Sequence, residues 1–424
     1  MSAIRIIIAA IAGCIVSVAS AIGAELLPFS DAVLIEGTPF RARLQSLNAD
    51  GMATWTLPSG ETRNLSLADL CWWGNWVGTP AQPQLVLVDG SVIVADVTSL
   101  NKEKLSIGWG LGGELKLPLE WVGGIIFAPS VDRQESDLMR FRLRGDGHPD
   151  VSAHSQPASQ KERVENAPDG DRLILLNGDE LQGEVLALDE NVIKFRTLAG
   201  EVSIGREKIA ALRFNPSLAA KPNSKDGQIW IGFQDGSRLL ASTLTIDRSQ
   251  AKIKLPAGIE FDVSAAKINA IQPLAGRTKY LSDLKPSGYQ HIPFLDLAWP
   301  YHADRNVAGS QLRAGGRLYL KGLGMHSAAR LTYDLTKPYR AFKAEVAIDD
   351  QTAGRGSALF RAYTNDGSGK WQIKYESPII RGGAAPAPIS VDLTGAKRLS
   401  LLVDFADHGD EQAHADWLNA RLLP

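Results

Sequence analysis

The stretch "LILLNGDELQGEVLALDENVIKFRTLAGEVSIGREKIAALRFNP", from Leu173 to Pro216, decides which kind of fold this chain adopts. A short apolar run meets the pair Asn177-Gly178, a strong signal for a tight turn between antiparallel strands. Alternating apolar and polar residues follow, and a second turn containing Gly200 leads into another run of this kind. Alternation with a period of two buries one face of a strand and leaves the other in water. The stretch therefore predicts a unit of four or five short antiparallel strands.

Three other stretches repeat this pattern, and they begin at Val33, Leu85 and Ile229. Each has a turn pair after its first apolar run: Glu36-Gly37, Asp89-Gly90 and Asp235-Gly236. The repeats predict an all-β chain in which small β-barrel or β-sandwich units follow one another in series. A β-propeller is the alternative, since a propeller blade takes about 40–50 residues. The irregular spacing between the repeats favours separate units.

The bulk composition excludes an electrostatic nucleic-acid binder. The chain has 424 residues, a net charge of −2 and 22% charged residues. Without a basic stripe or a positive net charge there is no footprint for a phosphate backbone. The length favours several domains, and we expect no nucleic-acid partner.

The N-terminus has the pattern of a targeting segment. An apolar run from Ile6 to Val18 is followed by the small residues Ala19-Ser20-Ala21. This predicts a signal peptide over residues 1–24 and an exported protein, periplasmic, at the cell surface or extracellular. An uncleaved membrane anchor is an alternative, although the run is shorter than the ~20 residues of a spanning helix. Cys14 ends a stretch similar to a bacterial lipobox, so a lipid anchor at Cys14 is another.

The remaining chain divides into four parts. Residues 25–129 and 172–274 each contain two repeats. Residues 130–171 are largely polar and lack periodicity, which predicts a flexible linker because such a segment buries too little apolar surface to become ordered. Residues 275–424 have a different composition and form a C-terminal domain.

The C-terminal domain reads as about eight short strands with connections rich in Gly and Asp, a pattern typical of a β-sandwich. Five of the seven histidines lie in it: His291, His302, His326, His408 and His414.

Several motifs of this domain occur in a fixed order. They are Gly322-Leu323-Gly324-Met325-His326-Ser327, then Leu331, Tyr333 and Leu335, then Phe342, Ala344, Val346 and Asp349, and finally His414-Ala415-Asp416-Trp417. The domain resembles the NPCBM domain, a carbohydrate-binding module associated with family 98 glycoside hydrolases. The resemblance implies a galactose-binding-like jelly-roll β-sandwich with sugar-binding loops at one end. It also implies that a structural calcium ion is the cofactor to expect.

Three roles are open for His326: catalytic base, metal ligand or structural group. Its neighbour Ser327 cannot serve as a nucleophile, because consecutive residues of a strand point to opposite faces. We therefore predict no catalytic residue. We predict that Gly322 and Gly324 allow a constrained turn in which His326 bonds Asp416, with Trp417 buried beside it. A direct sugar contact by His326 is the alternative.

A second group predicts sugar binding. Aromatic rings stack on the C–H faces of sugars while polar neighbours take the hydroxyl groups. The loop from residue 299 to 305 offers such a set: Trp299, Tyr301, His302, Asp304 and Arg305. Alternatively, Trp299 and Tyr301 belong to the core.

A third group predicts a metal site. Asp404, Asp407 and Asp410 offer the oxygen ligands that calcium requires. The alternative is an acidic turn in water.

Together these patterns predict an exported, non-enzymatic carbohydrate-binding protein whose partner is a glycan or polysaccharide. A divergent glycoside hydrolase with an appended binding module is one alternative, and a structural or adhesive surface protein is the other. The sugar itself stays open.

Overall fold

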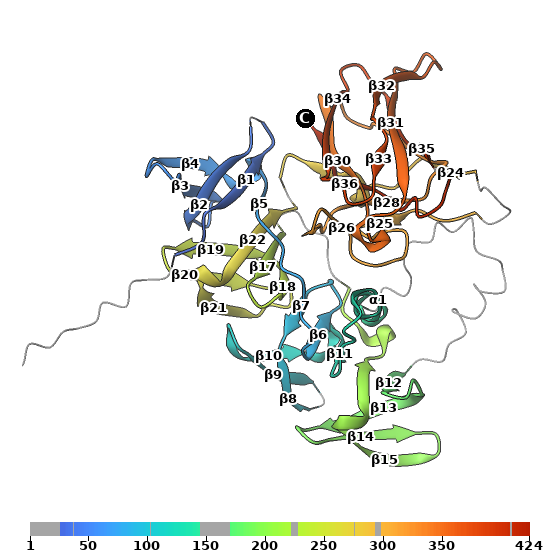
Figure 1. Cartoon of the computed structure of the whole chain (residues 1–424). Coiled ribbons are helices and arrows are strands. Elements are labelled where there is room, and N and C mark those ends of the chain that lie inside the picture. The colour runs from blue at the N-terminus through green and yellow to red at the C-terminus, as the bar shows by residue number, and fades with distance from the viewer. Residues whose placement is uncertain are drawn as a thin grey trace, which may run out of the picture.

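Four β repeats and a C-terminal β-sandwich make up the chain in the computed structural model, which describes residues 26–36, 38–101, 103–144, 170–221, 228–274, 276–292, 298–407 and 409–424 (Figure 1). The predicted signal peptide with Cys14 and most of the predicted linker lie outside these residues, as does His408. Among the described residues, no helix has both the length and the apolar character needed to cross a membrane.

The repeats have a common strand order. The first consists of β1 (Ser30–Leu34), β2 (Phe40–Leu47), β3 (Met52–Thr56), β4 (Thr62–Ser66) and β5 (Leu70–Gly74). The second consists of β6 (Gln84–Leu87), β7 (Val92–Val94), β8 (Asp96–Leu100), β9 (Lys104–Trp109), β10 (Gly113–Pro118) and β11 (Val122–Ile126). The third consists of β12 (Asp171–Leu175), β13 (Glu180–Leu188), β14 (Val192–Thr197), β15 (Gly200–Gly205) and β16 (Ile209–Arg213). The fourth consists of β17 (Ile229–Phe233), β18 (Arg238–Ala241), β19 (Thr243–Asp247), β20 (Gln250–Lys254), β21 (Glu260–Ser264) and β22 (Ile268–Pro273).

The predicted hairpins at Asp89-Gly90, Asn177-Gly178 and Asp235-Gly236 are confirmed, whereas Gly37 of the predicted Glu36-Gly37 turn lies outside the described residues. In the third repeat, β12 pairs antiparallel with β13 across the Asn177-Gly178 turn. Gly178 has a φ of 89°, a left-handed conformation that costs glycine least because it has no Cβ. A short 3-10 turn precedes the last strand of every repeat: η1 (Leu67–Asp69), η2 (Leu119–Trp121), η3 (Arg206–Lys208) and η5 (Ala265–Lys267). The units are therefore small antiparallel modules of the predicted kind.

The order of the repeats in space differs from their order in the chain. Strand β5 of the first repeat pairs with β22 of the fourth, β18 of the fourth pairs with β7 of the second, and β11 of the second pairs with β16 of the third. The spatial order is first, fourth, second and third, and Figure 1 shows it as a row from blue through yellow and cyan to green.

The C-terminal domain is the predicted β-sandwich. One sheet has the order β25-β28-β36-β30-β34 with β23 beside β36, and the other has the order β24-β29-β35-β31-β32 with β33 beside β31. The strands are β23 (Lys279–Tyr280), β24 (Gly288–His291), β25 (His302–Ala303), β26 (Arg313–Ala314), β27 (Arg317–Leu318), β28 (Gly322–Met325), β29 (Ala329–Asp334), β30 (Ala341–Ile348), β31 (Ser357–Asn365), β32 (Gln372–Glu376), β33 (Ile380–Arg381), β34 (Ala387–Asp392), β35 (Arg398–Phe405) and β36 (Ala415–Leu423). Large side chains such as Trp417, Phe342 and Phe360 fill the core between the sheets.

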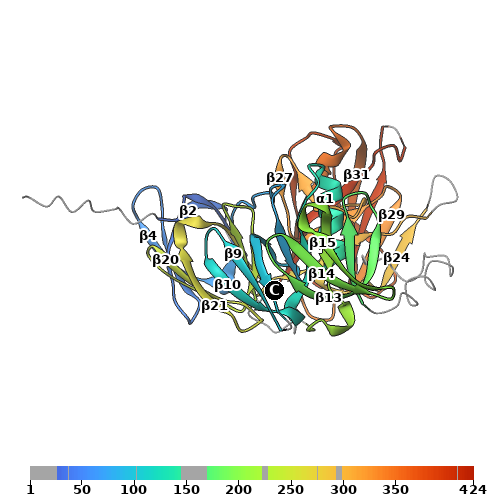
Figure 2. The same ribbon diagram turned by 90° about the horizontal axis from the view of Figure 1, so that it is seen from below.

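The prediction of a flexible linker over residues 130–171 is wrong for its first part. Residues 133–143 form the helix α1 (Arg133–Leu143), which starts at Asp132, whose side chain accepts a hydrogen bond from the Glu135 backbone N–H at 2.9 Å. Figures 1 and 2 both place α1 beside the C-terminal domain. The buried residues of the helix are mostly polar: Ser136, Asp137 and Arg140 together with Leu143. Asp137 bonds the C-terminal domain, and Leu143 packs in an apolar cluster with strands of the repeats.

Candidate functional site

Three histidines and a tryptophan gather at one end of the sandwich, and we call them the imidazole cluster: His291, Trp299, His326 and His414. His291 ends β24, His326 follows β28, and His414 precedes β36. The ring centroid of His326 lies 5.2 Å from that of Trp299, 6.2 Å from that of His291 and 5.8 Å from that of His414. Strand ends from both sheets thus bring the four rings together.

Trp299 is fixed through its backbone while its ring stays accessible. Its N–H donates to Nδ1 of His291 at 3.0 Å, and its carbonyl accepts from the Tyr289 hydroxyl. The side chain of Trp299 is 45% exposed. The indole and the His326 ring are inclined by only 30°, so the cluster presents an aromatic face beside imidazole nitrogens.

The imidazoles are uncharged near neutral pH. Burial, together with the neighbouring His414 and His291, lowers the pKa of His326 to about 3. Burial also lowers the pKa of His291 and of His414 below the ordinary value of 6.5. A neutral imidazole has one N–H donor and one nitrogen acceptor. The cluster can therefore exchange hydrogen bonds with hydroxyl groups and has no positive charge that would select an anion.

The predicted sugar loop does not form a single surface. Tyr301 packs partly buried against the core, and His302 is buried, which lowers its pKa to about 4. Asp304 accepts hydrogen bonds from Lys321 Nζ at 2.8 Å and from the backbone N–H of Gly322. The guanidinium carbon of Arg305 lies 4.5 Å from the centre of the Phe141 ring on α1. Of the five predicted loop residues, Trp299 alone contributes to the imidazole cluster.

His291 and His414 were not among the predicted site residues. The available signal was the concentration of histidines in the last third of the chain. The sequence does not show which strand ends meet, and this pairing selects these two from the set.

Residues 277–423 match the NPCBM/NEW2 domain family. The C-terminal domain is an NPCBM domain. The chain is 38% identical over 115 residues to the "Putative endo-alpha-N-acetylgalactosaminidase" of Renibacterium salmoninarum, covering 27% of this chain and 7% of that protein. The chain is also 28% identical over 120 residues to the "Alpha-1,3-galactosidase B" of Akkermansia muciniphila, covering 27% of this chain and 14% of that protein. The match therefore spans only a small part of either relative.

Solved structures of carbohydrate-binding modules are also similar. A CBM51 module from Clostridium perfringens in complex with methyl-galactose is 22% identical, and the match covers 34% of this chain and 99% of that one with a TM-score of 0.30. Tandem CBM51 modules of a family 98 glycoside hydrolase from Streptococcus pneumoniae are 14% identical, and the match covers 65% of this chain and 95% of that one with a TM-score of 0.30.

The predicted bond between His326 and Asp416 is wrong for the residues that the structure describes. Asp416 is completely buried and lies beside Asp349. Burial, reinforced by the charge of Asp349, raises the pKa of Asp416 well above its ordinary value. The neutral form of Asp416 is therefore favoured in the folded protein. Asp416 pairs in register with Gly324 inside the sheet, whereas His326 lies beyond the end of the strand.

Gly322 and Gly324, the two glycines before His326, allow close packing of the backbone and do not adopt a left-handed torsion. A Cβ on Gly324 would lie 2.4 Å from the Arg305 carbonyl oxygen, and one on Gly322 would lie 2.8 Å from that of Trp417. Both positions thus require glycine because neighbouring backbone occupies the space. Trp417 itself is completely buried, as predicted.

The three predicted metal ligands are not brought together. Asp404 forms an ion pair with Arg361, and Asp407 forms one with Arg381. The negative charge of Asp410 acts to raise the pKa of His291, although burial outweighs this effect. Within the described part of the chain there is no group of three or more His, Cys, Asp or Glu side chains that could hold a metal ion.

Proposed function

We propose that the NPCBM domain binds a neutral sugar residue at the imidazole cluster and that the chain is an exported, non-enzymatic carbohydrate-binding protein. The observation that carries this proposal is the half-exposed ring of Trp299, held in place beside the uncharged His326. The aromatic face stacks on the C–H face of a sugar. The imidazole nitrogens of His326 and His414 exchange hydrogen bonds with its hydroxyl groups.

Terminal galactosides are the first ligands to test. The names of the two curated relatives refer to galactose and N-acetylgalactosamine. A glycan array probed with the full chain tests the class, and neutral galactose-terminated glycans should give the strongest signal. An array without any bound glycan would refute the proposed function.

The site itself is tested by Trp299→Ala. We expect retention on an immobilised galactoside to disappear while the melting temperature stays within about a degree, because the exposed ring contributes little to folding. Trp371→Ala is the matched control, since this tryptophan is 38% exposed and is not part of the imidazole cluster. If Trp299→Ala is retained as well as the wild-type protein, the sugar binds elsewhere.

A divergent glycoside hydrolase is the second candidate, because both curated relatives have the names of glycosidases. Incubation of the full chain with nitrophenyl galactosides separates the two functions, since release of nitrophenol above the blank identifies an enzyme.

Export is tested by the mature N-terminus, which mass spectrometry should find after residue 24. A lipid on Cys14 would show a membrane anchor instead.

Calcium stays a prediction that melting curves can test. An ion that binds only the folded state raises its stability by mass action. A structural calcium ion requires a melting temperature several degrees higher with excess calcium than with a chelator, and identical curves would exclude it.

A further inference from the structure

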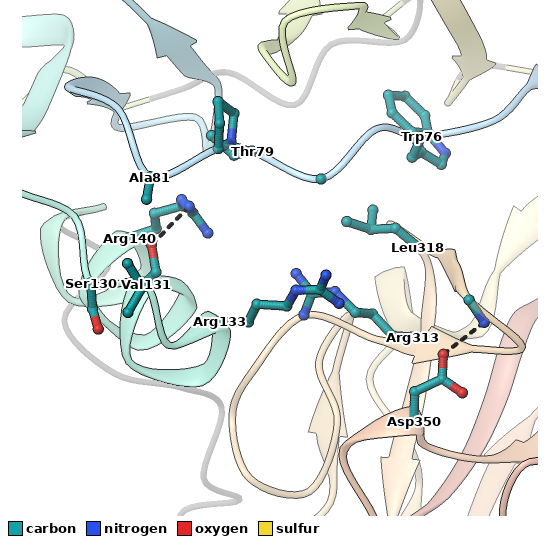
Figure 3. A pocket seen from close by; sticks show the side chains of 14 residues that line it. Trp76, Thr79, Ala81, Ser130, Val131, Arg133, Arg140, Arg313, Leu318 and Asp350 are labelled. Carbon is teal, nitrogen blue, oxygen red and sulfur yellow. Dashed lines mark hydrogen bonds between the residues drawn. The ribbon is translucent and has the colours of Figure 1, made fainter. Parts of the chain in front are cut away.

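A cavity of about 370 Å³ lies between the repeats and the NPCBM domain, and we call it the junction cavity (Figure 3). Trp76 and Arg133 line it from the repeat side, and Arg313, Leu318 and Asp350 line it from the NPCBM domain. A second cavity of about 450 Å³ shares Trp76 and Leu318 with it. Both volumes fall in the range of about 300–1,000 Å³ that small-molecule sites occupy. Neither part of the protein forms the junction cavity alone.

Two arginines point into the junction cavity. Figure 3 shows the side chains of Arg133 and Arg313 extending toward the middle of the cavity. Arg133 is exposed on the first turn of α1, and no ion pair to it exists among the described residues. The acidic residue at the edge, Asp350, accepts hydrogen bonds from the backbone N–H groups of Gly315 and Gly316 at 2.9 and 2.8 Å. Its carboxylate is thus held by the turn between β26 and β27.

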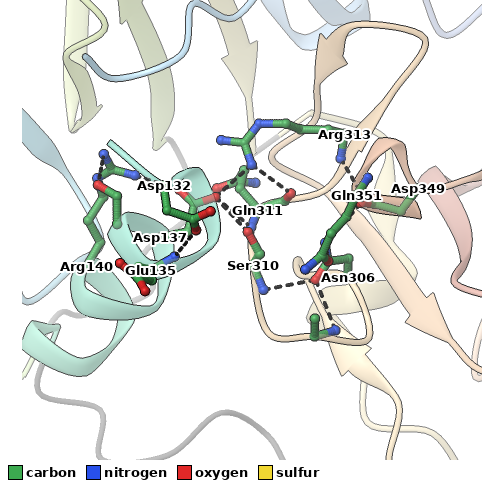
Figure 4. Close-up of polar contacts among 12 residues, drawn as sticks. Asp132, Glu135, Asp137, Arg140, Asn306, Ser310, Gln311, Arg313, Asp349 and Gln351 are labelled. Carbon is green, nitrogen blue, oxygen red and sulfur yellow. Dashed lines mark hydrogen bonds and ion pairs between the residues drawn. The ribbon is translucent and has the colours of Figure 1, made fainter. Parts of the chain in front are cut away.

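A buried network behind the cavity fixes Arg313 and leaves an excess of positive charge (Figure 4). Asp137 on α1 accepts hydrogen bonds from Arg313 Nη1 at 2.7 Å and from Ser310 Oγ at 2.8 Å, and Arg140 Nη1 binds its other oxygen at 2.5 Å. Burial alone would raise the pKa of Asp137, but the charges of Arg313, Arg140 and Arg238 outweigh burial and lower it. Arg140 and Arg313 thus both bind the one carboxylate of Asp137. The cavity is lined by three arginines, Arg133, Arg140 and Arg313, and by a single carboxylate, that of Asp350, so an anion is favoured there.

The tryptophan of the cavity is held from behind. A Cβ on Gly232 would lie 2.7 Å from Cε3 of Trp76, so the indole packs directly on the backbone of the fourth repeat. Trp76 is half-buried and lines both cavities. A rigid aromatic ring that lines the same cavity as two guanidinium groups suits a ligand with an apolar face and an anionic group.

We propose that the junction cavity is a second binding site, which takes a saccharide with a carboxylate or a sulfate group. The anionic group lies between Arg133 and Arg313, whose planar guanidinium groups match the oxygens of both anions. The sugar ring lies at Trp76. This site is independent of the imidazole cluster, which has no charge to attract an anion.

The test uses the full chain and calorimetric titration with galacturonic acid, galactose 6-sulfate and galactose. Val131 lines the cavity and is 91% exposed, so its replacement leaves the fold intact. We expect Val131→Asp to weaken binding of the anionic sugars about tenfold, because the new carboxylate competes for the arginines. Val131→Asn introduces a side chain of the same shape as Val131→Asp but without its charge. This variant should bind the anionic sugars within about twofold of the wild-type affinity.

Further variants separate this site from the imidazole cluster. Arg133→Ala should weaken the anionic sugars as Val131→Asp does, whereas Arg41→Ala, an exposed arginine of β2, should not. Trp299→Ala should abolish binding of galactose and leave binding of the anionic sugars unchanged. The proposal for the imidazole cluster and the proposal for the junction cavity can therefore fail separately. The proposal is overturned if neither anionic sugar binds, if Trp299→Ala abolishes their binding, or if Arg133→Ala leaves it unchanged.

Discussion

Asp416 lies in β36 with neither carboxylate oxygen accessible to water, and its neighbour Asp349 is equally buried. Asp349 accepts hydrogen bonds from the Asn306 side chain and from the backbone N–H groups of Gln351 and Arg313. These donors satisfy the carboxylate oxygens of Asp349, whereas burial beside Asp349 favours the neutral form of Asp416. Two ionised carboxylates in contact would repel each other in a medium of low dielectric constant.

This pair predicts an unusual pH dependence of stability. Because the folded-state pKa of Asp416 is raised, the folded state binds more protons than the unfolded state above about pH 3.8. The Asp416 contribution to the free energy of unfolding therefore falls as the pH rises, by up to about 1.4 kcal/mol per pH unit, until the pH exceeds the raised pKa. Asp416→Asn carries no such proton, so its stability relative to the wild-type protein should increase between pH 5 and pH 8.

Urea unfolding at a series of pH values measures this difference. Asp392→Asn is the control, since Asp392 is exposed and hydrogen bonds from Thr394 lower its pKa. Its difference from the wild-type protein should stay constant over the same range. Parallel curves for Asp416→Asn would mean that Asp416 is ionised in the folded protein.

Trp417 predicts the opposite kind of effect, a loss of stability at every pH. Its ring centroid lies 5.2 Å from that of Phe360 and 6.1 Å from that of Phe342. Trp417→Ala leaves a cavity among these rings and should cost about 3–5 kcal/mol. Chemical unfolding measures the loss, with the exposed Trp371→Ala expected to cost about 0.5–1 kcal/mol. Equal effects of the two substitutions would contradict the buried role of Trp417.

At the residue scale, the sequence predicted what local chemistry controls. Trp299 and His326 were predicted because an aromatic residue in a polar loop and a histidine after paired glycines are visible as short patterns. The partners His291 and His414 lie 35 and 88 residues from His326 along the chain, as the numbering in the sequence shows. His414 belongs to the short motif His414-Ala415-Asp416-Trp417, but no short pattern joins it to His291 or His326, because only the meeting of strand ends brings the three rings together.

At the scale of elements, α1 shows where pattern reading reached its limit. Its buried residues include Ser136, Asp137 and Arg140, all of which normally indicate a solvent-exposed face. The loop from residue 306 to 313 of the NPCBM domain binds Asp137 through Ser310, Gln311 and Arg313. Arg140 bonds Gln84 of β6 as well as Ser136 and Asp137 of its own helix. The hairpins of the repeats were predicted correctly, since an Asx-Gly turn is decided by neighbouring residues alone.

Asp137→Asn tests whether this network joins the two parts of the protein. The substitution leaves Arg140 and Arg313 at the junction without a carboxylate, which should cost about 3–5 kcal/mol. We expect calorimetry to show separate transitions for the repeats and the NPCBM domain. Glu135→Gln, on the exposed face of the same helix, should change the free energy of unfolding by less than about 0.5 kcal/mol. An unchanged transition for Asp137→Asn would show that other contacts hold the junction.

At the scale of the whole molecule, the number of repeats followed from the sequence and their arrangement did not. Each repeat was visible through its turn and its alternating strands. The spatial order depends on which exposed strand edges pair, as β5 does with β22, and the edges of four similar repeats look alike in sequence.

This arrangement predicts how damage to one repeat spreads. Ile271 is completely buried in β22, between β17 of its own repeat and β5 of the first. Ile271→Ala should destabilise the fourth repeat by about 2–5 kcal/mol. Hydrogen exchange should then accelerate in its spatial neighbours, at β5 and β7, while the third repeat, which precedes it directly in the chain, stays protected.

Leu212→Ala is the matched substitution at the other end of the row, since Leu212 is equally buried and β16 pairs with β11 and β12. The faster hydrogen exchange caused by Leu212→Ala should extend to the second repeat, and exchange in the first repeat should stay unchanged. Stability in a row of packed units is shared between units in contact. If Ile271→Ala accelerates exchange in the third repeat and not in the first, chain connectivity rather than strand pairing couples the repeats, and the pairing order given above does not govern their stability.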